Sequence, residues 1–390
     1  MEKVKVKSAE NMGKLFVNNN YSVIGHDGAY SIPLDDGRVF WTFGDTLLGF
    51  ERKDYDPTKI MLDEWLAQSW AKENVNMIGN TSCFVNVRNA SELVDTQPVY
   101  INKKNTAKEI IKTTLPPNRA GRYRPLWPMD GIFLNGNLYV FYIAVDCGPA
   151  NPEQEIADIN VYGAGVAKAS FPYTEFKRLT PTVLPNVPKD IANYNEYPYL
   201  WWNCDLDENL NQVPAFGTAV VKEVIDGYVY IFGSLMRKVD KRIVHGVALA
   251  RVKVKDIEDI TKFEYLQEDL SWGKDPKKSK IVFEGNANEL SVSYNKYLGK
   301  FIAIYSYVGE IKNNKLNRFL EEIHLRYADE LWGEWSEPQV IYKCEKSLEK
   351  DTCYAGKEHP EYSEKDGKII YITYVSHQRY WPELIRVEFE

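Results

Sequence analysis

Residues 25–50 read GHDGAYSIPLDDGRVFWTFGDTLLGF, and this stretch predicts one β-hairpin. Two runs of strand-forming residues, Ala29–Leu34 and Arg38–Phe43, flank the sequence Asp35-Asp36-Gly37. An Asp-Gly turn supplies the positive φ angle that tight hairpins need. We therefore expect the chain to reverse direction at these three residues.

The length of that turn decides which acidic side chains face each other. With a three-residue loop, Leu34 pairs with Arg38, and the same register places Asp27 opposite Asp45 with Cβ atoms about 5 Å apart. Two carboxylates that close repel unless one holds a proton or a substrate needs both. A two-residue loop, Asp36-Gly37, would instead place Asp27 opposite Thr46. The other alternative is that both acids only cap strand ends.

The hairpin pattern recurs four more times along the chain. Each copy has a strand, a turn that ends in glycine, and a strand rich in aromatic or β-branched residues. The five turn glycines are Gly37, Gly136, Gly227, Gly299 and Gly367. A weaker pair of strands follows each hairpin, so the sequence predicts an all-β fold, a five-bladed β-propeller. A β-sandwich is the alternative, but it does not predict five similar units.

Long segments interrupt the first repeats. Apolar residues in Asp56–Asn76 have nearly helical spacing and predict a short helical insertion in the first blade. Residues Ala107–Lys112 predict one more turn of helix. The aromatic-rich segment Asn186–Gln212 predicts an ordered surface loop. Because no linker or low-complexity tract occurs, we expect residues 1–390 to form a single domain.

Composition excludes several function classes. The net charge of −7 and the scattered basic residues argue against a nucleic-acid partner. No apolar run is long enough to span a membrane as a helix. The N-terminus has no apolar core of a secretory signal and the five cysteines are widely spaced, so we expect free thiols and a cytoplasmic location. A secreted chain whose leader had been removed would look the same.

Acidic residues occur at the predicted starts of the first strands of four repeats. They are Asp27, Asp130, Glu289 and Glu361. In a propeller these starts converge near the axis, where clustered carboxylates suit glycoside cleavage: one acid protonates the departing oxygen and another carboxylate attacks the anomeric carbon or activates water. The alternative for each acid is that it binds backbone N–H groups.

Aromatic and polar residues beside these acids are candidate sugar contacts. The predicted substrate-binding residues are Asp130, Glu361, Trp127, His359, Tyr30, Asn288 and Trp201. Further candidates for stacking on a sugar ring are Trp41, Trp202 and Trp381. For each tryptophan the alternative is a place in the core.

Other chemistries have little support in the sequence. Gly163-Ala-Gly-Val-Ala-Lys lies in a strand pattern, which argues against a nucleotide-binding loop. The five histidines have no metal-ligand spacing, and we expect no cofactor or metal, with a cation at the axis as the alternative. The rival functions are a carbohydrate-binding propeller without turnover and a glycoside phosphorylase, for which Arg122, Arg124 and Arg379 are the available phosphate ligands.

Three parts of the chain resemble the family called domain of unknown function 4185, which is linked with glycoside hydrolase family 183, the endo-D-arabinanases. They are residues 28–38 with 43–46, residues 289–301, and residues 359–363. The resemblance implies a five-bladed propeller, hydrolysis of arabinofuranosyl linkages, and a catalytic carboxylate pair at Asp27 and Asp45.

Together these patterns predict a glycoside hydrolase acting on a furanosyl or related glycan. We interpret Asp27 as the nucleophile or base and Asp45 as the acid, with exchangeable roles, and Glu289 as a third catalytic carboxylate. Glu361 and Asp130 are predicted to support them.

Overall fold

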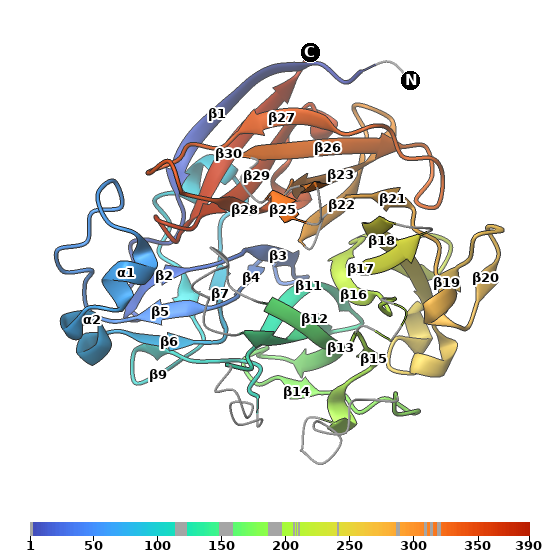
Figure 1. Cartoon of the computed structure of the whole chain (residues 1–390), viewed down its shortest axis with the longest axis horizontal. Helices are drawn as coiled ribbons and strands as arrows, with labels where there is room; N and C mark the ends of the chain where they lie inside the picture. The colour runs from blue at the N-terminus through green and yellow to red at the C-terminus, as the bar shows by residue number, and fades with distance from the viewer. Residues whose placement is uncertain are drawn as a thin grey trace. The chain divides into compact units, whose positions relative to one another are not determined.

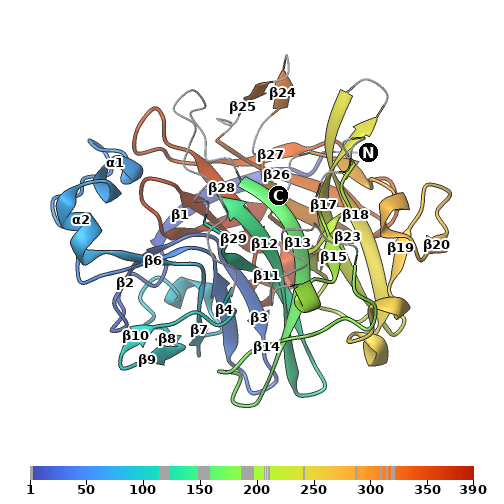
Figure 2. The same ribbon diagram turned by 60° about the horizontal axis from the view of Figure 1, so that its bottom comes forward.

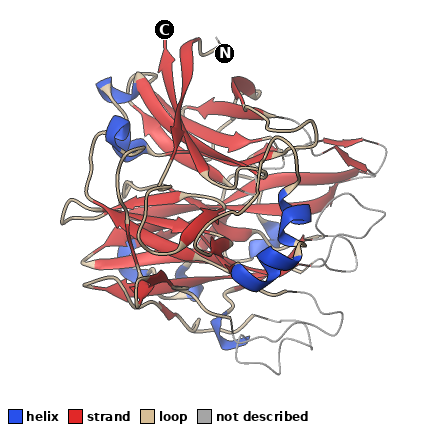
Figure 3. Ribbon diagram, turned by 90° about the vertical axis from the view of Figure 1, so that its left-hand side faces the viewer, coloured by secondary structure: helices blue, strands red, loops and turns tan. Residues whose placement is uncertain are grey.

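The structure, a computed structural model, describes residues 3–113, 123–147, 159–185, 197–205, 207, 209, 211–239, 242–285, 289–307, 310–312, 315–317 and 321–390. Strands dominate this part of the chain, and its α-helices are two short ones, α1 (Leu62–Leu66) and α2 (Ser69–Asn74) (Figure 3). The prediction of an all-β fold with a short helical insertion is therefore confirmed. None of these helices has the length and apolar character that crossing a bilayer would need.

The chain divides into two compact units, one made of residues 1–109 and 289–390 and the other of residues 110–288. The prediction of one domain stays a prediction, and each unit is described by itself below.

The first unit holds three four-stranded antiparallel sheets, with strand orders β3-β4-β7-β8, β22-β23-β26-β27 and β1-β30-β29-β28. Their strands are β1 (Val6–Lys14), β3 (Tyr30–Pro33), β4 (Val39–Phe43), β7 (Thr81–Val85), β8 (Val99–Tyr100), β22 (Leu290–Asn295), β23 (Lys300–Ser306), β26 (Glu322–Ala328), β27 (Gln339–Lys343), β28 (Cys353–Glu358), β29 (Ile369–Ser376) and β30 (Pro382–Phe389). Smaller sheets are formed by β2 (Val23–His26), β5 (Thr46–Leu48) and β6 (Asn76–Ile78), by β9 (Asn102–Lys103) and β10 (Thr106–Ala107), and by β24 (Glu310–Lys312) and β25 (Lys315–Asn317).

The second unit holds two larger sheets. The first runs β11-β12-β13-β14 with β15 also paired to β13, and the second runs β16-β17-β18-β19-β20 with β21 also paired to β18. Their strands are β11 (Leu126–Leu134), β12 (Asn137–Cys147), β13 (Ile159–Ser170), β14 (Lys177–Arg178), β15 (Trp202–Asn203), β16 (Ala215–Val220), β17 (Tyr228–Val239), β18 (Arg242–Lys253), β19 (Glu264–Leu266), β20 (Trp272–Gly273) and β21 (Phe283–Glu284).

The turns of all five predicted hairpins are present, and the strands on either side of each turn pair in a different sheet of at least four strands. In the fifth hairpin the first strand is β28, which ends at Glu358, so the strand predicted to begin at Glu361 is wrong. The five turn glycines, Gly37, Gly136, Gly227, Gly299 and Gly367, all have positive φ angles between 62° and 93°. A residue with a Cβ rarely adopts this conformation, which explains why glycine ends each turn. The arrangement of the five sheets as five blades stays a prediction.

The N-terminal strand was not predicted. β1 pairs with β30 along its length, from Val6 opposite Phe389 to Lys14 opposite Glu383, and so completes the sheet that contains the last hairpin. Figure 1 shows β1 (blue) beside β30 (red), with the two ends of the chain close together. The alternation of lysine and valine at residues 3–7 overlaps only the first two residues of β1, so this pattern did not indicate the strand.

The predicted helical insertion forms α1 and α2 beside the sheet β2-β5-β6 (Figure 2). Helix α1 buries Leu62 and Trp65, whose indole N–H donates to the carbonyl of Lys53 at 2.9 Å. The helical turn predicted at Ala107–Lys112 is wrong, because Ala107 belongs to β10 and its N–H donates to the carbonyl of Tyr21. Of the predicted loop Asn186–Gln212, the described part includes β15, which joins a sheet.

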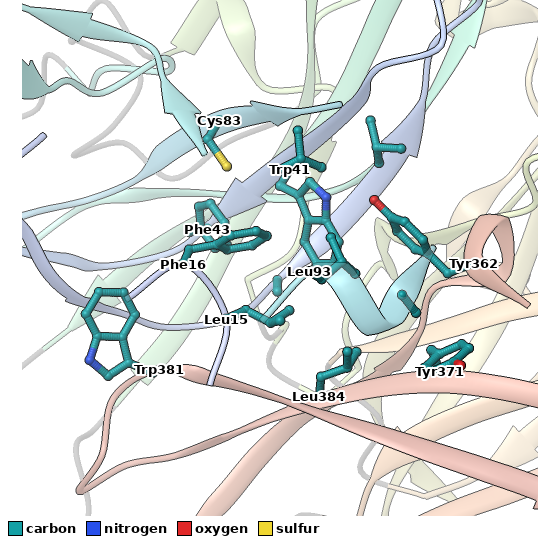
Figure 4. Packing of buried hydrophobic residues seen from close by; sticks show 14 of the residues in the cluster. Leu15, Phe16, Trp41, Phe43, Cys83, Leu93, Tyr362, Tyr371, Trp381 and Leu384 are labelled. Atoms are coloured by element: carbon teal, nitrogen blue, oxygen red, sulfur yellow. The ribbon is translucent and has the colours of Figure 1, made fainter. Parts of the chain in front are cut away.

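One hydrophobic cluster in the core of the first unit contains Trp41 on β4. The ring of Trp41 packs edge-on against Phe16 with centroids 5.2 Å apart, and Phe43 also packs edge-on against Phe16, with centroids 5.8 Å apart. Figure 4 shows these rings together with Leu15, Leu93 and Leu384. Trp41 has no exposed surface, so the prediction that it could stack on a sugar is wrong.

The burial of Trp41 makes a stability prediction. Trp41→Ala removes the largest side chain of this cluster, and we expect the free energy of unfolding in urea to fall by about 3–5 kcal/mol. The matched variant Trp127→Ala, at a half-buried position on β11, should cost clearly less. Equal losses in the two variants would contradict the assignment of Trp41 as a core residue.

Candidate active site

The predicted register of the first hairpin is confirmed. Leu34 N–H donates to the carbonyl of Arg38 at 2.9 Å, and β3 pairs with β4 from Pro33 opposite Val39 to Tyr30 opposite Thr42. The loop is therefore the three residues Asp35–Gly37, and the two-residue alternative is wrong.

The same register continues past the ends of β3 and β4 to the two acids. Asp27 N–H donates to the carbonyl of Asp45 at 3.0 Å, and Gly44 N–H donates to the carbonyl of Asp27 at 3.2 Å. Beyond them, His26 pairs with Thr46 as β2 meets β5. Asp27 and Asp45 thus lie opposite each other in the short gap between two paired stretches, and both are half-buried.

Two glycines lie beneath the acidic side chains. A Cβ atom placed on Gly44 would lie 2.8 Å from Asp27 Oδ1, and one placed on Gly28 would lie 3.3 Å from Glu289 Oε1. Gly28 also has a φ angle of +54°, which disfavours other residues. The bare backbone of Gly28 and Gly44 therefore leaves room for the carboxyl groups of Asp27 and Glu289, and we call these two residues the glycine floor.

Glu289 reaches this place from the residue just before β22, as the repeat pattern predicted. Its Oε1 accepts a hydrogen bond from Lys357 Nζ at 2.7 Å. The lysine side chain is only 1% exposed, whereas that of Glu289 is 24% exposed. The ammonium also lies 4.1 Å from the ring centroid of Tyr30 on β3.

The crowding of acids perturbs Asp27. Its pKa is raised well above the usual value, first by loss of hydration and then by the negative charges of Glu289 and Asp45, while Lys357 acts in the opposite direction. Two phenols lie in the same electrostatic environment: burial and nearby acids raise the pKa of Tyr354 and of Tyr380, which stay neutral at ordinary pH. The site thus favours a proton on Asp27.

Two of the predicted supporting acids, Asp130 and Glu361, have surroundings that differ from the prediction. Asp130, in the second unit, accepts hydrogen bonds from the backbone N–H groups of Gly131 and Val220 and pairs with Lys222. This binding of backbone N–H groups is the alternative that the sequence left open, and it replaces the predicted sugar contact. Glu361 lies in a 3-10 helix, η6 (Pro360–Tyr362), beyond the end of β28, and not at the start of the strand as predicted.

His359 is also a structural residue. Its Nδ1 lies 2.6 Å from Ser31 Oγ and its Nε2 lies 2.8 Å from Thr373 Oγ1, and the side chain is 1% exposed. The prediction that it contacts substrate is therefore replaced by a role in joining β3 to β29.

Most of the predicted aromatic contacts belong to the core. Trp201 is buried, donates from its indole N–H to the carbonyl of Leu179 and packs on Trp202. Trp202 and Trp381 are buried as well. Trp127 is half-buried, Tyr30 is buried against Lys357, and Asn288 lies outside the described residues.

Sequence reasoning missed Lys357 and Tyr354, both on β28. The register of β28 against β29 shifts between Tyr354 and Lys357, and Ala355 inside this bulge has a φ angle of +59°. The available signal was a lysine directly after the apolar segment Cys353–Gly356, where burial requires a partner. Among the described residues, no group of three or more histidine, cysteine, aspartate or glutamate side chains is placed to hold a metal ion.

The all-β fold and the acids of its first hairpin can now be set beside known proteins. The model of the family Domain of unknown function (DUF4185) matches residues 17–386, and the chain belongs to this family. No curated protein matches the sequence.

Several solved structures are similar. A "putative hydrolase" from Bacteroides ovatus ATCC 8483 has a TM-score of 0.54 and 15% identity, over 95% of this chain and 87% of that one, and this similarity concerns the fold. A GH43_1 enzyme from Xanthomonas citri has a TM-score of 0.45 and 12% identity, over 97% and 90%. An exo-1,5-α-L-arabinanase from a bovine ruminal metagenomic library has a TM-score of 0.42 and 9% identity, over 95% of each chain.

The raised pKa of Asp27 predicts how stability depends on pH. The folded state holds this proton more tightly than the unfolded chain does, so Asp27 lowers the free energy of unfolding as pH rises from about 4 through its folded pKa. Asp27→Asn removes this titration, and the variant should be more stable than the wild type at neutral pH.

Urea unfolding between pH 4 and 8 measures the effect. The advantage of Asp27→Asn should shrink toward pH 4, where the wild-type side chain is protonated in the folded state and partly protonated in the unfolded chain. Asp36→Asn is the control, because Arg38 lowers the pKa of Asp36 and its loss should bring no gain. An advantage of Asp27→Asn that did not vary with pH would contradict the raised pKa.

Proposed function

We propose that this protein is a glycoside hydrolase that cleaves furanosyl, arabinan-like or related glycan linkages with Asp27 and Asp45. The observation that supports this most strongly is the cross-strand placement of the two acids, with a raised pKa on Asp27. One carboxyl group that keeps its proton next to another that can be ionised is the arrangement that glycosidic bond cleavage requires. The resemblance to the endo-D-arabinanases supports a furanosyl substrate.

The pKa favours one assignment of roles. Asp27, the group that holds a proton, is the general acid and donates it to the departing glycosidic oxygen. Asp45 is the carboxylate that acts at the anomeric carbon. This exchanges the roles first assigned from the sequence, which the sequence had left exchangeable. Glu289 is a third carboxylate whose charge raises the pKa of Asp27.

The close pairing of the two acids favours retention of configuration. Directly opposed residues have Cβ atoms about 5 Å apart, which lets their carboxyl groups reach the separation of about 5–5.5 Å that retaining enzymes hold. Asp45 then attacks the anomeric carbon as Asp27 protonates the leaving oxygen. Water next attacks this carbon, gives its proton to Asp27 and releases the sugar from Asp45.

The phosphorylase alternative loses support at the arginines it needs. Arg124 is buried and pairs with Asp146 at 3.6 Å, Arg379 pairs with Glu383, and Arg122 lies outside the described residues. A carbohydrate-binding protein without turnover remains the rival, and it gives no reason for two opposed acids.

Activity on a panel of arabinans and other glycans tests the proposal. Asp27→Asn and Asp45→Asn should each lower product formation by about 10²–10⁴-fold or more while the fold is kept, because a proton donor or a nucleophile is lost. Circular dichroism checks folding. Binding of a glycan by the wild type without any product, unchanged in both variants, would favour the binding protein instead.

The glycine floor gives a second test. Gly44→Ala places a methyl group 2.8 Å from Asp27 Oδ1 and must displace that carboxyl group, so we expect kcat/KM to fall by about 10²-fold. Gly333→Ala is the matched control, because its new Cβ meets its neighbours at 3.4 Å or more and its activity should be unchanged. Wild-type activity in Gly44→Ala would remove Asp27 from the reaction.

Stereochemistry gives a third test. Proton NMR of the first product formed should show the anomer of the substrate, and added methanol should be converted to a methyl glycoside by the same intermediate. Initial formation of the opposite anomer, without a methyl glycoside, would contradict attack by Asp45 and favour activated water.

A further inference from the structure

Lys357 is a buried cation in the middle of an acidic site. Lysine is almost never fully buried unless it is paired, because loss of hydration disfavours its charge. Here the 2.7 Å contact with Glu289 and the face of the Tyr30 ring at 4.1 Å offset that loss. No step of the proposed hydrolysis uses this lysine, so its place needs a separate explanation.

The bulge in β28 determines where Lys357 lies. Such a bulge bends its strand and redirects a side chain. On one side of Lys357, Gly356 N–H, inside the bulge, donates to Ser306 Oγ on β23 at 2.8 Å. On the other side of Lys357, Glu358 N–H donates to Ser291 Oγ on β22 at 2.7 Å.

A second contact strengthens this attachment. Glu358 Oε2 accepts from Ser293 Oγ at 2.5 Å. These contacts fasten β28 to β22, the strand that begins directly after Glu289. Lys357 and Glu289 are thus held together by the backbones of two neighbouring strands.

The charges around Asp27 come from four parts of the first unit. Asp45 lies opposite it in the first hairpin, Glu289 precedes β22, Lys357 and Tyr354 come from β28, and Tyr380 follows β29. The two phenols are neutral. Of the remaining groups, two carboxylates raise the pKa of Asp27 and the lysine lowers it.

We propose that Lys357 is a positioning residue that holds Glu289 in place as a carboxylate, so that the proton of the acid cluster stays on Asp27. This inference rests on the proposed function, because it assigns the proton to the group that donates it. Lys357 acts through Glu289 and makes no contact with substrate. Its charge also limits how far the two carboxylates raise the pKa of Asp27.

Carbon-13 NMR of aspartate carboxyl groups tests this without substrate. The Asp27 signal is assigned by its loss in Asp27→Asn, and its titration midpoint is then measured in variants. Lys357→Met removes the positive charge and should move the midpoint to higher pH, and Glu289→Gln removes a negative charge and should move it to lower pH, each by about one pH unit or more.

Shifts of opposite sign are not expected from a general loosening of the site. Lys300→Met is the matched control, because Lys300 pairs with the exposed Asp329 in the same sheet as β22, and it should leave the midpoint unchanged. If Lys357→Met does not fold, Glu289→Gln still tests the charge on which the proposal depends.

No shift in either variant, or shifts in the same direction, would overturn the proposal. Failure of the hydrolase proposal would look different. The wild type would form no product from the glycan panel, while the titration midpoint of Asp27 would still shift in Lys357→Met and Glu289→Gln.

Discussion

The repulsion among three carboxyl groups is the constraint on which the rest of this site depends. Asp27, Asp45 and Glu289 are close enough to raise the pKa of Asp27, and no ordinary core would gather them. Two features make the arrangement stable. The glycine floor gives the carboxyl groups room, and Lys357 supplies the opposite charge. We regard the proton on Asp27 as the chemical result of this balance.

The fold brings these groups together from distant parts of the sequence. The first hairpin supplies Asp27 and Asp45, the fourth supplies Glu289 and the fifth supplies Lys357. The contacts that fasten β28 to β22 join the fifth hairpin to the fourth. His359 joins the fifth hairpin to the first through Ser31, and it also contacts Thr373 within its own hairpin. A small movement of β28 would therefore change the distance between the positive charge of Lys357 and Asp27, although β28 carries no proposed catalytic residue.

The sequence predicted the parts of this site that depend on local rules. Turn chemistry and the two-residue period of strands placed Asp27 opposite Asp45 for a three-residue loop, which is the loop that the structure has, and the repeat placed Glu289. Glu361 was misplaced because Pro360 begins a 3-10 helix, so the strand of the fifth hairpin ends earlier than its siblings suggested. The tryptophans were misassigned because burial depends on packing between sheets. Lys357 was missed because the bulge in β28 that sets its position leaves no turn or periodic pattern in the sequence.

The central claim is that Asp27 and Asp45 act on a glycosidic bond. A crystal structure of the Asp27→Asn variant with a bound oligosaccharide tests it most directly. The account predicts a glycosidic oxygen within hydrogen-bond distance of the residue 27 side chain, with the Asp45 carboxylate facing the adjoining anomeric carbon. An oligosaccharide bound elsewhere, with no sugar in contact with either residue, would contradict it.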